Sequence, residues 1–190
     1  MARYKKLKLP KKSIFTRGEA LAAGLTVYGL RQLIARGTIE KVNRGVYRVS
    51  SAEVSEEESY KAASLRIGFP SAICVLTALS HYQLTDAIPK KVWLLVDASK
   101  RTGHRDIRLL RARNAHWKVG IEKRGGYWLT SLERTLVESV IYRRFIGSNV
   151  AMEAVRRAVR EEKTTLGDLM DMAKRLGVLD RLRPYIEALA

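Results

Sequence analysis

The sequence has few of the features that exported, metal-binding or membrane-spanning proteins need. Among its 190 residues Cys74 is the one cysteine, which excludes an internal disulfide and a cysteine-based metal cage. The histidines His81, His104 and His116 lack the spacing of metal ligands. No apolar stretch approaches the roughly 20 residues that span a bilayer, and the basic N-terminus has no secretory signal pattern. We expect a protein of the reducing cytoplasm with no metal, cofactor or membrane partner.

Sequence signatures of common catalytic sites are also missing. No GxxxxGK phosphate-binding loop occurs. A metal-dependent nuclease needs clustered carboxylates, and the central region offers only Asp97, Asp106 and Glu122. Because Lys123 follows Glu122 directly, these residues do not form an acid-x-Lys pair on a strand. The inventory predicts that the chain is not an enzyme, and a nuclease remains the least favoured alternative.

Positive charge is the property that the sequence has in excess. The 36 Lys and Arg against 19 Asp and Glu give a net charge of +17, which favours a polyanionic partner such as nucleic acid. Residues 1–50 carry 12 basic and 2 acidic side chains, a net charge of +10. The polar, acidic segment at residues 51–59 has the composition of a linker. We therefore expect two domains, residues 1–52 with a basic N-terminal tail and residues 58–190.

The first domain carries the signals of two short helices. Thr16, with Glu19 three residues later, forms a capping box that predicts a helix over residues 17–24. Thr26 has the position of a second N-cap. The helix that it opens has the apolar stripe Val27, Leu30, Leu33 and Ile34, and it ends at Gly37.

A β-hairpin is predicted directly after these helices. Residues 38–42 and 45–50 alternate apolar and polar side chains on either side of a tight turn at Asn43-Arg44-Gly45. This order of elements is that of a winged helix-turn-helix, whose second helix enters the DNA major groove while the hairpin follows a phosphate backbone. The polar residues of the module are the predicted DNA contacts: Arg17, Thr26, Tyr28, Arg31, Gln32, Arg36, Lys41, Asn43, Arg44 and Arg48. An ordinary solvated surface remains the alternative for any one of them.

Three blocks of sequence resemble one known family, in the same order. They are FTRGEALAAGLTVYGLRQLIARGTIEKVNRGVYRV (15–49), PSAICVLTALSHYQLTDAIPKKVWLLV (70–96) and LTSLERTLVE (129–138). The family is that of the AbiEi antitoxins of AbiE-type (type IV) toxin–antitoxin systems, which act in phage abortive infection. The resemblance implies an autorepressor that binds repeats of double-stranded operator DNA in its own operon promoter. It also implies that the protein counteracts a nucleotidyltransferase-like toxin without forming a stable complex with it.

The second domain is predicted to be α+β, with two helices, a small sheet and a helical tail. The helices are expected over residues 57–68 and 72–84, the latter buried and capped by Ser71, and the strands at 91–97, 107–113 and 126–129. A capping box of Thr130 and Glu133 predicts a helix over residues 132–145, and three more fit 148–162, 165–176 and 178–189. Arg134 and Glu138 are spaced either for a surface helix pair or for a buried anchor.

A basic strip crosses the predicted sheet of this domain. Its members are Lys100, Arg101, Arg105, Arg108, Arg111, Arg113, Lys118, Lys123 and Arg124. They are either solvated strand edges protected against aggregation or a second nucleic-acid surface that extends the DNA footprint or binds RNA. Trp93, Trp117 and Trp128 can stack on unpaired bases, although the apolar neighbours of Trp93 favour packing in the core. An RNA-binding protein is the main alternative to a DNA-binding regulator.

Overall fold

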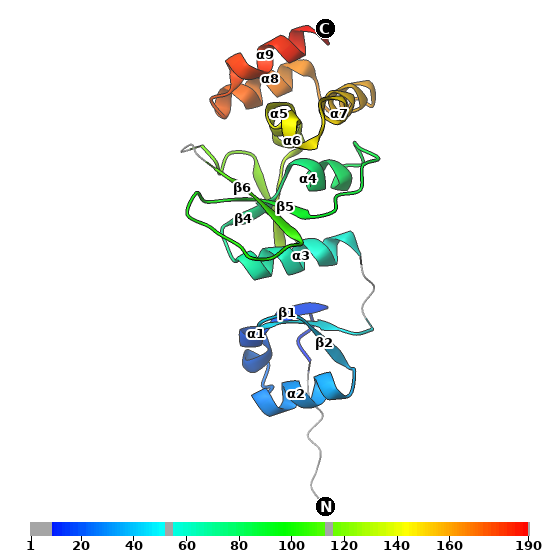
Figure 1. The fold of residues 1–190 in the computed structure, drawn as a ribbon, viewed down its shortest axis with the longest axis vertical. Coiled ribbons are helices and arrows are strands. Elements are labelled where there is room, and N and C mark those ends of the chain that lie inside the picture. Colours follow the sequence, from blue (N-terminus) through cyan, green and yellow to red (C-terminus); the bar gives the residue numbers. More distant parts are fainter. Residues whose placement is uncertain (1–8, 52–54, 113–115, 190) are drawn as a thin grey trace, which may run out of the picture. The chain divides into compact units, whose positions relative to one another are not determined.

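The computed structural model describes residues 9–51, 55–112 and 116–189. The chain divides into two compact units, Met1–Arg66 and Ile67–Ala190 (Figure 1). Helices and sheets alternate along both, so the predicted α+β class is confirmed. Within the described ranges no helix is long and apolar enough to cross a membrane.

The first unit is built on a three-stranded antiparallel sheet of order β1-β3-β2. Its strands are β1 (Ile14–Thr16), β2 (Ile39–Asn43) and β3 (Val46–Val49). The helices α1 (Arg17–Ala22) and α2 (Val27–Ala35) precede the β2–β3 hairpin, as the sequence predicts. β1 was not expected as a strand. It forms because Ile14 and Phe15 pair with Arg48 and Tyr47 of β3, far away in the sequence.

Local signals set the two helix starts in this unit. The Thr16 backbone N–H donates to Glu19 Oε2 at 2.8 Å, and Thr16 Oγ1 accepts from the Glu19 N–H at 3.1 Å, which completes the predicted capping box. At α2, Thr26 Oγ1 accepts from the Gly29 N–H at 3.0 Å. The buried side chains of α1, α2 and one face of the sheet form a small core: Phe15, Ala20, Leu25, Leu30, Leu33, Ile39 and Tyr47.

The opposite face of the same sheet is covered by α3 (Glu56–Ile67). Ala62 packs with Ile14 and Val46, and the Arg66 guanidinium donates to the Val42 carbonyl at 3.1 Å. The division between the units therefore falls after Arg66, whereas the sequence led us to expect a second domain from residue 58. The acidic start of α3 resembles a linker in composition, although its later turns carry small and apolar side chains that are buried.

The second unit has a five-stranded mixed sheet of order β6-β5-β4-β8-β7. Its strands are β4 (Ser71–Ile73), β5 (Val92–Val96), β6 (Ile107–Arg111), β7 (Ile121–Arg124) and β8 (Tyr127–Thr130). The pairs β5·β6 and β4·β8 are parallel, and the others are antiparallel. β7 was not predicted, because it is a charged edge strand without a continuous apolar pattern.

The central strand β4 corrects the prediction of a helix capped by Ser71. Ser71, Ala72 and Ile73 are all buried and pair with β5, and α4 (Val75–His81) begins only after Cys74. A short run that is apolar on all sides suits a fully buried strand as well as a buried helix, and hydrophobic periodicity cannot distinguish the two. The predicted element was therefore assigned the wrong type over its first three residues.

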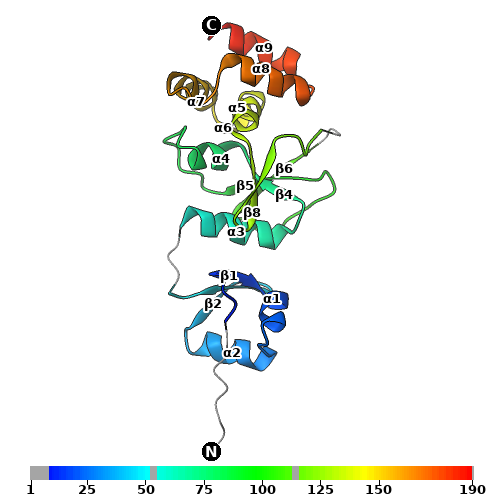
Figure 2. The same ribbon diagram turned by 180° about the vertical axis from the view of Figure 1, so that it is seen from behind.

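The helices after β8 form a layer next to the sheet (Figures 1 and 2). They are α5 (Leu132–Ile141), α6 (Arg143–Ile146), α7 (Ser148–Arg160), α8 (Leu166–Arg175) and α9 (Leu179–Glu187). α5 contacts α4, α7, α8 and α9, and its apolar residues Leu136, Val137 and Val140 are fully buried. The single helix predicted over residues 132–145 is therefore two helices, α5 and α6.

The N-cap of α5 is Ser131 and not Thr130. Ser131 Oγ accepts from the Arg134 N–H at 3.3 Å, and the predicted capping box with Glu133 does not form. The Thr130 hydroxyl instead donates to the Ile73 carbonyl at 3.2 Å and lies 2.7 Å from the Thr135 hydroxyl. Thr130 thus joins β8 to β4 in the buried centre of the unit.

Candidate nucleic-acid interface

The exposed face of α2 holds three of the predicted DNA contacts. The helix buries Gly29, Leu30 and Leu33 against its own unit. On the other side Tyr28 is 70% exposed, Arg31 is exposed, and the Gln32 side-chain amide donates to the Tyr28 hydroxyl at 3.1 Å. Base edges in the major groove are read by side chains of this kind, among which Arg recognises guanine and Gln recognises adenine.

The buried stripe of α2 differs from the predicted one. Val27 and Ile34 were expected to face the core, but they are 40% and 36% exposed. Gly29, which was not expected to face the core, is buried with Leu30 and Leu33. The two apolar residues flank the exposed face, where they can contact thymine methyl groups.

The N-terminus of α2 offers donors to a phosphate. Thr26 is exposed, and its hydroxyl oxygen caps the Gly29 N–H. The first N–H groups of a helix have no partner within the helix and attract anions. Arg36, the C-cap residue, is exposed at the opposite end of α2, and Arg17 is exposed at the start of α1.

The hairpin does not present its predicted contacts on a single face. Arg44 is exposed in the turn, and its backbone N–H donates to Asn43 Oδ1 at 2.6 Å. Lys41 lies opposite Tyr47, on the sheet face that packs against α1 and α2. Arg48 lies opposite Glu40 and Ile14, on the face covered by α3, and its guanidinium binds the Glu40 carboxylate. Arg48 is therefore engaged within the unit, whereas Lys41 and Arg44 are exposed.

The capping carboxylate at the start of α1 is held in its charged form. Partial burial raises the pKa of Glu19, but hydrogen bonds from Lys12 and Thr16 outweigh it and leave the pKa below its usual value. Glu19 is thus ionised at neutral pH, and its negative charge at the N-terminus of α1 interacts favourably with the helix dipole.

Residues 7–50 match a family model for transcriptional regulators of the AbiEi antitoxin type. The N-terminal module is similar to AbiEi antitoxin regulators. The match spans α1, α2 and the hairpin and ends before α3. Comparison of the whole chain with curated proteins gives no match. This similarity supports a DNA-binding regulator of the antitoxin class, with DNA as its class of partner.

The basic strip of the second unit is not one continuous surface. β6 and β7 are the two opposite edges of the sheet, so Arg108 and Arg111 of β6 lie far along the sheet from Lys123 and Arg124 of β7. Arg124 also pairs with Glu122 at 2.7 Å. Of the other members, Lys100, Arg101 and Arg105 lie in the loop between β5 and β6, Lys118 lies in the turn before β7, and Arg113 falls outside the described residues.

The three tryptophans have different environments. Trp93 is buried in a cluster with Cys74 and Leu95, which confirms its predicted place in the core. Trp117 is half-buried beside the same cluster. Trp128 is half-buried with its ring 5.1 Å from that of Phe69, so neither Trp117 nor Trp128 presents a fully open face for stacking.

The Arg134–Glu138 pair is the buried anchor and not a surface pair. Arg134 is 2% exposed, and its Nε and Nη2 both donate to Glu138 Oε1, at 3.0 and 2.9 Å. Its Nη1 donates to the carbonyls of Trp117 and Val119, which fixes the segment before β7 against α5. Burial raises the pKa of Glu138, although Arg134 opposes this shift.

Within the described ranges, no group of three or more His, Cys, Asp or Glu is placed to hold a metal ion.

Proposed function

We propose that this protein is a transcriptional autorepressor and antitoxin of a type IV toxin–antitoxin system. In this proposal, α2 and the hairpin bind repeats in the promoter of the protein's own operon. The protein also counteracts a nucleotidyltransferase-like toxin encoded beside it, without forming a stable complex. The observation that carries the proposal is the outer face of α2 in a module similar to the AbiEi type, where Tyr28 and Arg31 are exposed and Gln32 is half-buried.

Two further properties of the first unit support binding to duplex DNA. The net charge of +10 over residues 1–50 supplies the sequence-independent attraction to phosphates. The turn residue Arg44 and the N-terminus of α2 supply phosphate contacts, which position a protein on DNA but do not read its sequence. Specificity is therefore expected from Arg31 and Gln32, and general affinity from Arg44.

The decisive experiment is a salt-titrated binding assay with the protein's own upstream DNA and a scrambled duplex of equal length. We expect tighter binding to the upstream DNA, with an affinity that falls steeply as salt rises. Arg31→Ala or Gln32→Ala should lower the preference for the upstream DNA by about 1–3 kcal/mol. Lys61→Ala, which removes a positive charge on α3 of the same unit, is the matched control. Equal affinity of the native protein for both duplexes would overturn the proposal.

Neutralisation is tested by co-expressing the full chain with the neighbouring toxin gene and measuring growth. We expect the native protein to restore growth and the toxin not to co-purify with it. Arg31→Ala should lose operator preference but still restore growth, because the change is confined to the exposed face of α2. Failure of the native protein to restore growth would refute the antitoxin part of the proposal and leave the repressor part standing.

A further inference from the structure

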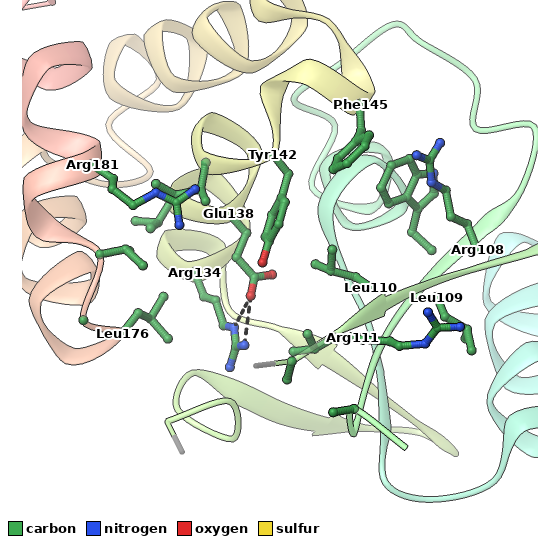
Figure 3. Close-up of a pocket in the computed structure, with 18 of the residues that line it drawn as sticks. Arg108, Leu109, Leu110, Arg111, Arg134, Glu138, Tyr142, Phe145, Leu176 and Arg181 are labelled. Atoms are coloured by element: carbon green, nitrogen blue, oxygen red, sulfur yellow. Dashed lines mark hydrogen bonds and ion pairs between the residues drawn. The ribbon is translucent and has the colours of Figure 1, made fainter. Parts of the chain in front are cut away.

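The second unit contains a cavity of about 920 Å³ that combines arginines with aromatic rings. Its walls come from β5, β6, the loop between them, α5, α6, the segment that leads into α9, and α9 itself (Figure 3). The lining has five arginines and one glutamate: Arg101, Arg108, Arg111, Arg134, Arg181 and Glu138. Figure 3 shows Arg181 on one side of Glu138 and Arg108 and Arg111 on the other. The cavity is therefore strongly positive and large enough for a small anionic molecule.

Four of these arginines have no carboxylate partner in the part of the chain that the structure describes. Arg101 donates to the carbonyls of Ala98 and Lys100, and Arg111 donates to the carbonyl of Lys100. Such bonds orient a guanidinium without cancelling its charge. Arg101, Arg108, Arg111 and Arg181 form no ion pair with a carboxylate of the described residues. Side chains with this charge and geometry bind phosphate oxygens.

Aromatic rings line the same cavity beside the arginines. The rings of Tyr142 and Phe145 lie 6.4 Å apart and nearly parallel, and Phe145 is 57% exposed. The Arg108 guanidinium lies 4.2 Å from the Trp93 ring and 5.0 Å from the Phe145 ring, which holds it in place. An exposed ring next to fixed cations suits a ligand that has a planar base and a phosphate.

Glu138 supplies a buried acceptor, Oε2, that no described residue uses. Both bonds from Arg134 go to Oε1, and Oε2 is buried without a partner among the described residues. Its carboxylate lies among the lining residues of the cavity (Figure 3). A buried oxygen of this kind is normally paired, and the N–H donor of a nucleobase would satisfy it.

We propose that this cavity binds a nucleotide, with its phosphates on Arg181 on one side of Glu138 and its base on Phe145 on the other side, where a base N–H donates to Glu138 Oε2. An inorganic anion would use the arginines but leave Glu138 unsatisfied and the rings unused. An acidic peptide would bring no planar donor to Oε2. A nucleotide matches all three features, whether it is free or one unit of a single-stranded RNA.

The test measures quenching of tryptophan fluorescence in the full chain, because Trp93 lines the cavity. The ligands are the four ribonucleoside triphosphates, a single-stranded hexaribonucleotide and inorganic tripolyphosphate, at one fixed salt concentration. Arg181→Ala should raise the Kd about tenfold or more, since it removes a charged hydrogen-bond donor. Arg183→Ala removes the same charge from the same helix outside the cavity and should leave the Kd unchanged.

Two further variants test the base. Glu138→Gln replaces the Oε2 acceptor and should weaken nucleotide binding while tripolyphosphate binding stays the same. Phe145→Ala removes the ring that holds the base and should likewise weaken nucleotide binding without changing tripolyphosphate binding. Because Phe145 is exposed, this variant leaves the buried Arg134–Glu138 pair intact. Binding by the hexaribonucleotide alone supports the proposal with RNA as the source, and binding by a free triphosphate supports it with the free nucleotide.

Three results would overturn the nucleotide site. They are no saturable binding of any base-containing ligand, tripolyphosphate binding as tightly as the nucleotides, or equal effects of Arg181→Ala and Arg183→Ala. None of these results bears on operator binding by α2, because the two sites lie in different units and use different residues.

Discussion

Replacing Arg134 with Met should destabilise the second unit more than any other single change we predict. Met keeps much of the length of the side chain but removes the charge and all four hydrogen bonds that Arg134 makes to Glu138, Trp117 and Val119. Glu138 would be left as a buried carboxylate without a partner, and two carbonyls of the segment before β7 would lose their donor.

The size of the effect follows from the burial of the pair, whose side chains are 2% and 10% exposed. Breaking a buried ion pair by removing one partner costs about 3–5 kcal/mol. A domain of this size has a total stability of roughly 5–15 kcal/mol, so Arg134→Met should bring the second unit close to unfolding.

The loss of stability in Arg134→Met should also depend on pH. Burial already raises the pKa of Glu138 in the native protein, and removal of Arg134 takes away the charge that opposes this shift. The folded variant then binds a proton at a pH where the unfolded chain does not, so a fall in pH stabilises the fold of the variant. The deficit of Arg134→Met relative to the native protein should therefore be smaller near about pH 5 than near about pH 8.

Urea denaturation followed by tryptophan fluorescence is the suitable assay, because Trp93, Trp117 and Trp128 all lie in the second unit. Arg156→Met is the matched control, since Arg156 is half-exposed and pairs with Glu153 on the surface of α7. We expect no measurable change in the control. A loss below about 1 kcal/mol in Arg134→Met, the range of surface pairs, would refute the buried-anchor argument, as would a loss that does not change with pH.

Three further predictions concern single residues. Arg44→Ala should weaken binding to all DNA sequences alike and lower the slope of log affinity against log salt concentration by about 1. Arg48→Ala should change DNA affinity little, because the Arg48 guanidinium already binds Glu40. Affinities measured at several salt concentrations compare the two variants. Thr16→Ala should cost about 1 kcal/mol through loss of the capping box, seen by circular dichroism as a lower melting midpoint of the first unit. Burial raises the pKa of the Cys74 thiol well above its usual value, so a thiol reagent at neutral pH should label it only after unfolding in urea; rapid labelling of the native protein would contradict this.

The sequence was most informative where structure is set by neighbouring residues. The caps at Thr16 and Thr26 depend on groups within three residues and occur as predicted, and the turn predicted at Asn43-Arg44-Gly45 forms at Arg44 and Gly45, with Asn43 at the end of β2. β1 and β4 were not recognised because each is three residues long and exists through partners elsewhere in the chain. Strands this short carry too little periodicity to separate them from loops or helices.

The two candidate sites also differ in how far the sequence could predict them. The exposed face of α2 was largely predictable, since Tyr28, Arg31 and Gln32 lie off the hydrophobic stripe, although Val27 and Ile34 were placed on the wrong side. The cavity could not be predicted, because its residues come from β5, β6, α5, α6 and α9 and have no common spacing. Arg181 in particular lies on a helix whose sequence indicates only an amphipathic surface.

The block LTSLERTLVE resembles the AbiEi family, and the structure gives this block a structural role. Thr130 and Thr135 join β8 to β4 and α5, Ser131 caps α5, and Arg134 ties α5 to the segment before β7. These side chains are buried, so none of them is available to contact a protein partner or duplex DNA. In the proposed antitoxin function, this buried block therefore does not locate the surface that would neutralise a toxin. A variant of this block that loses neutralisation must first be shown to keep its stability, and the neutralising residues should be sought among exposed positions outside it.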